Sequence, residues 1–178
     1  MRLPEGSKGI LQDDRNGFPE RSCAGRWFSL TDLELAKKRM EDTALTLCIA
    51  RDGKVIFEGA SRGISGFLDA VESLGGKLEG ASIADRVVGR AVALLCVDSR
   101  VRAVYASTLS RDARQLFDGC SVRVECGELV ESILDVGRRE RCPFERLAAD
   151  IVDPKVAYGR FRALQSSLRQ GQGKRFGR

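Results

Sequence analysis

Two short β-rich runs joined by a tight turn constrain the fold of this chain more than any other feature. Residues 46–50 and 55–58 are rich in apolar and β-branched side chains, and Asp52 and Gly53 lie between them. An Asp-Gly pair readily adopts the positive φ angles of a two-residue hairpin turn. Helical and strand patterns alternate after this hairpin, which predicts parallel strands with helices on both faces. The sequence therefore predicts an α/β fold with a mixed sheet.

The first helix is expected just before the hairpin, over about residues 31–41. Ser29 or Thr31 can cap its start, with Asp32 or Glu34 in the reciprocal position of a capping box. The later elements are expected as follows: a helix from Gly66 to Leu74, a buried central helix from Ala84 to Val97, a strand over 102–108, a short helix from Ser110 to Phe117, a strand over 121–126, a helix opening at Pro143, and an amphipathic segment from Asp153 to Leu168.

Composition predicts one domain with a tail at each end. Residues 1–28 combine glycine, proline and scattered charge without periodicity, which is typical of an irregular extension. The α/β domain is expected over 29–168 and a flexible basic tail over 169–178. Residues 154–178 carry seven Lys/Arg and no Asp or Glu, so the formal net charge of +5 comes from this end. Such a tail can contact nucleic acid weakly and non-specifically, or it can be a solvated terminus.

Cysteine usage and hydropathy indicate a soluble, cytoplasmic protein. The six cysteines form no Cys-x-x-Cys pair, and several lie inside apolar runs, which favours a reducing compartment. No stretch approaches the roughly 18 apolar residues of a membrane span, and the N-terminus lacks the apolar run of a signal peptide. We expect no membrane contact, no metal site and no cofactor.

The order of helix, hairpin, helix, strand, helix and strand resembles the cytidine-deaminase-like superfamily. Residues 33–38 followed by 48–59 are similar to the first helix and hairpin of such domains. More narrowly, residues 61–64, 84–91 and 142–145 resemble an uncharacterised prokaryotic family, domain-of-unknown-function family 1893, a divergent member of that superfamily. The resemblance covers about residues 30–160 and implies a three-layer α/β/α fold. The family has no established activity that could be carried over.

The resemblance also implies where a zinc site would lie. In zinc deaminases a His-Ala-Glu triplet opens the central helix, and Pro-Cys-x-x-Cys opens the helix after the third strand. The chain contains no histidine, and the corresponding places hold Ile83-Ala84-Asp85 and Ser110-Arg111-Asp112, which lack the usual ligands. We therefore do not expect an active zinc-dependent deaminase. Asp85 either keeps a carboxylate near the proton-shuttling position or is an ordinary first-turn helix residue.

A metal-free crevice between two helix starts suggests a small-anion site. If the helices beginning near Ala84 and Ser110 point into one crevice, their free N–H groups favour a phosphorylated or carboxylated ligand, such as a nucleotide. The leading hypothesis is therefore a non-catalytic ligand-binding or regulatory module. Alternatively, the arginines lie on solvated faces, the hydroxyls only cap helices, and residues 61–66 form a simple turn. The expected ligand-binding residues are Ser61, Gly63, Asp85, Arg86, Ser107, Thr108, Ser110 and Arg111.

Two other classes of function remain open. One is a metal-independent enzyme that uses Asp85 or Cys142, because a thiol at a helix start with arginines just upstream has a favoured thiolate. In the competing interpretation, Cys142 caps this helix and Glu145 completes a capping-box-like turn. The other class is a protein-interaction subunit that uses the sheet edge or a helix face. The sequence leaves oligomerisation open.

Overall fold

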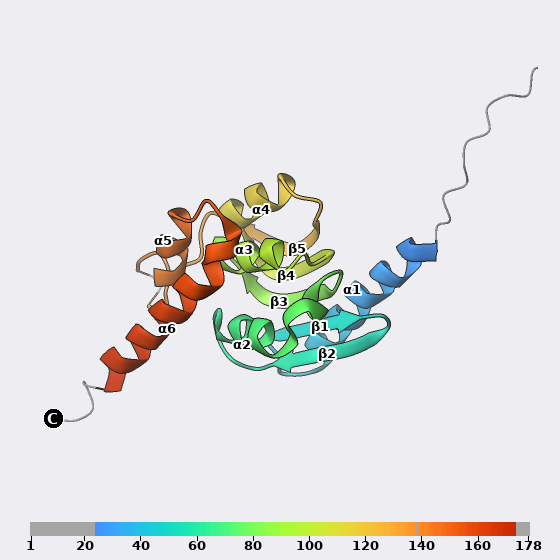
Figure 1. The fold of residues 1–178 in the computed structure, drawn as a ribbon, viewed down its shortest axis with the longest axis horizontal. Helices are drawn as coiled ribbons and strands as arrows, with labels where there is room; N and C mark the ends of the chain where they lie inside the picture. The colour runs from blue at the N-terminus through green and yellow to red at the C-terminus, as the bar shows by residue number, and fades with distance from the viewer. Residues whose placement is uncertain (1–23, 138, 174–178) are drawn as a thin grey trace, which may run out of the picture.

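A five-stranded sheet forms the middle of the molecule, with strand order β2-β1-β3-β4-β5. The computed structural model describes residues 24–137 and 139–173 (Figure 1). Strand β1 is antiparallel to β2 and β3, while β3, β4 and β5 run parallel. The strands are β1 Leu47–Arg51, β2 Lys54–Gly59, β3 Ser82–Val88, β4 Ala103–Ser110 and β5 Arg123–Val130. The α-helices are α1 Ala24–Asp42, α2 Ser65–Leu74, α3 Arg90–Asp98, α4 Arg111–Asp118, α5 Pro143–Ala149 and α6 Ala157–Gly173, with short 3-10 turns at Gly75–Leu78 and Pro154–Val156.

The predicted hairpin is confirmed, and helix α1 holds its turn. Asp52 and Gly53 have φ angles of 54° and 73°, as a two-residue hairpin turn requires. The buried carboxylate of Asp32 accepts hydrogen bonds from their backbone N–H groups at 3.0 and 2.7 Å. The predicted role of Asp32 near a helix cap is therefore wrong, because α1 begins at Ala24 and places Asp32 well inside the helix.

Both ends of the described chain are more helical than predicted. Helix α1 starts at Ala24 rather than near residue 31, so the predicted cap positions 29 and 31 lie inside the helix and the predicted start is wrong. Helix α6 continues from Ala157 to Gly173, past the predicted end at Leu168. The rest of the predicted irregular extension and flexible tail falls outside the described residues. No helix among residues 24–137 and 139–173 is long and apolar enough to cross a membrane.

The main correction concerns the predicted helix over residues 84–97. Ser82–Val88 form the strand β3, and helix α3 begins only at Arg90, after Gly89. Strand β3 pairs with β1 on one side and β4 on the other. Burial along β3 does not alternate, because residues 82–85 and 88 are buried while Arg86 and Val87 are exposed, and its apolar residues run on into those of α3. Periodicity alone cannot distinguish this run from a buried helix.

Helices cover both faces of the sheet and give the predicted three layers. Helix α1 packs on one face, where Ala36 and Met40 join Cys48 and Ala84 in a small core. The opposite face carries the larger core, to which α2 to α6 all contribute buried side chains. Its largest fully buried aromatic residues are Phe67, Phe117 and Phe161. Because α5 and α6 supply part of this core, they are integral to the domain.

Replacing Asp32 by alanine tests the attachment of α1 to the hairpin. The substitution removes the acceptor of two turn N–H groups, and we expect it to lower the free energy of unfolding by roughly 1–3 kcal/mol. Urea denaturation measures this loss, and Glu34→Ala on the exposed face of the same helix is the control. Equal effects of the two substitutions would contradict the role of Asp32.

Candidate functional site

The start of helix α3 is occupied by a side chain of the protein itself. The carboxylate of Glu145 from α5 accepts hydrogen bonds from the backbone N–H groups of Arg90 and Ala91, at 2.8 and 3.0 Å. These first N–H groups of a helix are the donors that a bound anion would use. Glu145 is only 3% exposed, so the contact is inaccessible to solvent. The predicted anion site is therefore filled at this helix.

Glycine at position 89 makes this close approach possible. A Cβ atom on Gly89 would lie 2.3 Å from Oε1 of Glu145, so any side chain there would displace the carboxylate. The guanidinium of Arg90 donates to the carbonyl oxygens of Ala148 and Ile151 at 3.0 and 3.2 Å, which fixes the far end of α5. Residues at the start of α3 thus hold both ends of helix α5.

Opposing effects act on the ionisation of Glu145. Burial raises its pKa, while the two backbone N–H groups and the nearby Arg141 and Arg90 lower it in part. Arg141 also pairs with Asp112 in the first turn of α4. The predicted capping box at α5 is wrong, because Glu145 is directed to α3 and the thiol of Cys142 makes no capping hydrogen bond.

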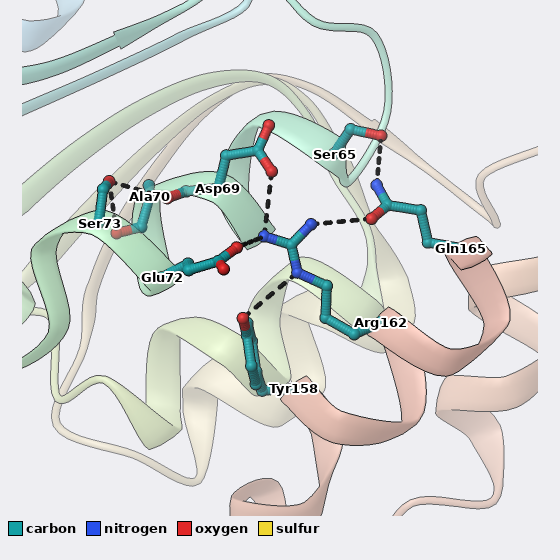
Figure 2. A network of polar contacts seen from close by, with 8 residues as sticks. All are labelled: Ser65, Asp69, Ala70, Glu72, Ser73, Tyr158, Arg162 and Gln165. Atoms are coloured by element: carbon teal, nitrogen blue, oxygen red, sulfur yellow. Dashed lines mark hydrogen bonds and ion pairs between the residues drawn. The ribbon is translucent and has the colours of Figure 1, made fainter. Parts of the chain in front are cut away.

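Helix α6 covers the start of helix α2. The side-chain amide of Gln165, which is 5% exposed, donates to the hydroxyl of Ser65 at 2.8 Å. Figure 2 shows the neighbouring Arg162 between the two helices, where it bonds Tyr158 and Gln165 and forms ion pairs with acidic residues of α2. Those acidic residues are Asp69 and Glu72. The C-terminal helices α5 and α6 therefore engage the starts of both α3 and α2.

Asp85 lies in strand β3 and not at a helix start, which corrects its predicted setting. Its side chain accepts from the backbone N–H of Val87 at 3.0 Å, and Asp85 is 8% exposed. Burial raises its pKa to about 7, although backbone N–H groups of Arg86 and Val87 oppose the shift. Cys96 of α3 is fully buried, and its pKa is raised well above the usual value by burial and by the charge of Asp85. Shifted pKa values occur at functional sites and at buried structural carboxyls alike, so this shift alone assigns no role to Asp85.

The other predicted donors at the ends of β3 and β4 have partners within the chain. Arg86 donates to the carbonyl of Leu45 at 2.7 Å, and Arg111 pairs with Glu131 at 2.8 Å. Ser110 is fully buried and caps α4 by accepting from Ala113 N–H at 3.1 Å, so its predicted cap is confirmed. These internal contacts use the groups that the sequence suggested for a ligand.

The remaining predicted residues lie on strand β4 and on the loop before α2. Ser107 and Thr108 are half-buried in β4. Ser61 and Gly63 are exposed, Gly63 has a φ angle of 68°, and the carbonyl of Ser61 accepts from the Thr46 hydroxyl at 2.7 Å. No side chain caps α2 in the described structure. This loop is therefore the part of the predicted site that stays open.

The places that the resemblance assigns to zinc ligands also need correction. The helix after the third strand is α3 and not α4, and it opens with Gly89-Arg90-Ala91-Val92. The His-x-Glu motif precedes Pro-Cys-x-x-Cys in the signature, so its helix would be α2, which opens at Ser65-Gly66-Phe67. In the part of the chain that the structure describes, no three His, Cys, Asp or Glu residues form a group that could hold a metal. These residues do not fit the zinc site of a deaminase.

The two edges of the sheet differ in how they are protected. At one edge, β2 contains an extra residue, because Ile49 pairs with Phe57 while Ala50 pairs with Val55. At the other edge, β5 keeps one register with β4 from its first residue to its last, and most of its residues are exposed. Exposed apolar side chains lie on β5 and on the segment after it: Leu129 at 47%, Leu134 at 46% and Val136 at 99%. The edge of β5 was not among the predicted site residues.

Fold and site together define a three-layer α/β/α domain with a mixed five-stranded sheet, in which a buried carboxylate occupies the start of helix α3. A family model described as "TM1506: Domain of unknown function (DUF1893)" matches residues 35–165, and the chain belongs to this family. The crystal structure of a DUF1893 family protein (TM1506) from Thermotoga maritima has a TM-score of 0.68 and 25% sequence identity. That match covers 76% of this chain and 89% of the Thermotoga chain.

Similarity beyond the family is weaker. Two forms of Acinetobacter baumannii RibD match with 18% identity and TM-scores of 0.41 and 0.38, over 75% of this chain and 40% of the RibD chain. The chain thus spans less than half of RibD, and these TM-scores support no assignment of activity. No curated protein matches the chain.

The pKa of Asp85 predicts a pH-dependent stability. The folded-state pKa of about 7 exceeds the usual 3.8, so folding favours the protonated carboxyl. Its contribution is fully present below about pH 4 and is lost as the pH rises to about 7. We expect the stability advantage of Asp85→Asn over the wild type to grow by roughly 2–4 kcal/mol between about pH 4 and pH 8. Urea denaturation measures it, with exposed Asp98→Asn as the control; an advantage that is independent of pH would contradict the shift.

Proposed function

We propose that this domain is a non-catalytic protein-interaction module, and a divergent member of the cytidine-deaminase-like superfamily, that binds a polypeptide along strand β5. The regular, exposed edge of β5 carries the proposal. The outer edge of a terminal strand presents N–H and C=O groups that can pair with another chain. Exposed Leu129 on β5, with Leu134 and Val136 exposed on the segment that follows, supplies apolar surface of the kind found at interaction sites.

The occupied start of helix α3 supports a non-catalytic role. In open α/β sheets, ligands usually bind in the crevice at the carboxyl ends of the strands. Here the carboxylate of Glu145 takes the first N–H groups of α3, whereas no side chain caps α2. A ligand at the start of α3 would have to displace a bonded and buried carboxylate. The surface of the sheet edge is open without any such rearrangement.

A second candidate function is the binding of a small phosphorylated or carboxylated ligand at the start of α2. The observation that favours it is the exposed loop Ser61–Gly63, where Gly63 has a φ angle of 68° and no side chain caps the helix that follows. Arg62 in this loop is exposed and could pair with an anion. This candidate retains the open part of the predicted ligand site.

Phosphate titration separates the two candidates. We expect inorganic phosphate to leave the melting temperature of the wild type unchanged, because Glu145 already occupies the start of α3. Glu145→Ala frees two buried N–H groups and should cost roughly 2–5 kcal/mol of stability. Phosphate should then raise the melting temperature of this variant, because an anion can replace the missing carboxylate. Differential scanning fluorimetry measures both effects.

Sodium chloride at matched ionic strength controls for general salt effects, and Glu140→Ala on the exposed surface is the matched variant. A phosphate-dependent shift in the wild type that Arg62→Ala abolishes would favour the ligand-binding candidate over the interaction module. The same shift persisting in Arg62→Ala would contradict both assignments.

A further inference from the structure

We propose that the partner of strand β5 is a second copy of this chain, paired antiparallel along the β5 edge so that two sheets join into one. This inference rests on the proposed function and identifies its partner. It is carried by the regular register of β5 and by the distribution of charge along residues 123–131.

The backbone of β5 suits an added strand. Its pairing with β4 runs without a shift from Arg123, opposite Ala103, to Val130, opposite Ser110. Natural proteins protect free edges with bulges, prolines, short strands or charged side chains, and of these devices β5 has only charged side chains, at Arg123, Glu125 and Glu128. Strand β2 carries such a bulge at the opposite edge, whereas β5 is eight residues long and contains no proline. Only β5 therefore offers an undistorted edge in the described sheet.

A twofold axis perpendicular to the sheet restricts the possible registers. Residues that face each other across such an antiparallel pair must lie on the same face of the sheet. The axis must therefore run midway between the two copies of one residue. With the axis at Gly127, Arg123 lies opposite Glu131 of the second copy, and Val124 lies opposite Val130. Opposite charges and apolar pairs at facing positions stabilise strand pairing. This register also places Leu129, which is 47% exposed, against the aliphatic stem of Glu125.

The neighbouring registers are less favourable. An axis at Glu128 places Glu128 against its own copy and Glu125 against Glu131, and like charges directly opposite each other destabilise a strand pair. An axis at Cys126 places Arg123 opposite Leu129 and forms no pair of opposite charges. The axis at Gly127 also brings together two residues without side chains. Glycine is required at this position because a Cβ would lie 2.9 Å from the carbonyl oxygen of Ser107. Within one chain, Arg123 already pairs with Glu125 and Glu131 with Arg111, both at 2.8 Å, so a pair across the axis adds to these exposed ion pairs or replaces them. Among the three registers, only the axis at Gly127 places opposite charges face to face.

Charge reversal tests the inference in the full-length protein. Sedimentation velocity over a concentration series should show a reversible dimer for the wild type. Glu131→Arg should raise the dissociation constant about 10-fold or more, because it places Arg123 against an arginine twice in each dimer. The double variant Arg123→Glu with Glu131→Arg should recover tighter association. Arg111→Ala, which removes the intrachain partner of Glu131 and leaves the edge charges in place, is the matched control and should leave the dimer unchanged.

Cross-linking tests the register itself. In a Cys126→Ser background, Glu125→Cys with Leu129→Cys should form an interchain disulfide on oxidation, whereas Glu125→Cys alone should not. A wild type that stays monomeric at every concentration, or a dimer indifferent to Glu131→Arg, would overturn the inference. A dimer that disappears when residues 170–178 are removed but tolerates Glu131→Arg would overturn it in favour of the basic tail. None of these results depends on the phosphate titration, so the two proposals can fail separately.

Discussion

The contact between Glu145 and the first turn of helix α3 is the interaction on which the attachment of helix α5 depends. One carboxylate satisfies two backbone N–H groups at a buried helix start, which would otherwise remain without acceptors. The contact requires glycine at position 89, and the return bonds from Arg90 to the end of α5 hold the carboxylate in place. A motif that would otherwise bind an external anion is thereby converted into an attachment point for the C-terminal helices.

Two acidic side chains are buried inside the domain at a cost in desolvation free energy. Both Glu145 and Asp85 are buried, and desolvation raises the pKa of each. Glu145 is offset by two N–H groups and by Arg141 and Arg90, whereas for Asp85 the opposing contacts are backbone N–H groups alone. The two carboxyls therefore differ in kind. The contacts of Glu145 offset part of its desolvation without reversing the shift of its pKa, and Asp85 is better accommodated as a neutral acid.

Local signals in the sequence predicted local structure well. The hairpin, helix α2, the Ser110 cap and the helix that opens at Pro143 each follow from a turn residue, a cap or a short periodic run. Strand β3 was missed because its apolar residues run on into the apolar stripe of helix α3, and periodicity alone does not separate the two elements. The partner of Glu145 lies 55 residues earlier, and that of Asp32 lies 20 residues later. Neither long-range pair leaves a signal in a single sequence. The position of Glu145 after Cys142-Pro143 suggested a cap of its own helix, and the structure shows that it caps α3 instead.

The two edges of the sheet differ in how their backbones are protected from pairing with another chain. The carboxylate of Glu145 fills the start of α3, while most residues of β5 are exposed, Leu129 among them. A free edge exposes a protein to unwanted pairing, and the bulge in β2 shows one remedy within the same sheet. The absence of that remedy along β5 needs a physical reason. Pairing with a chosen partner supplies it, because the backbone groups that make an edge hazardous are those that an added strand satisfies.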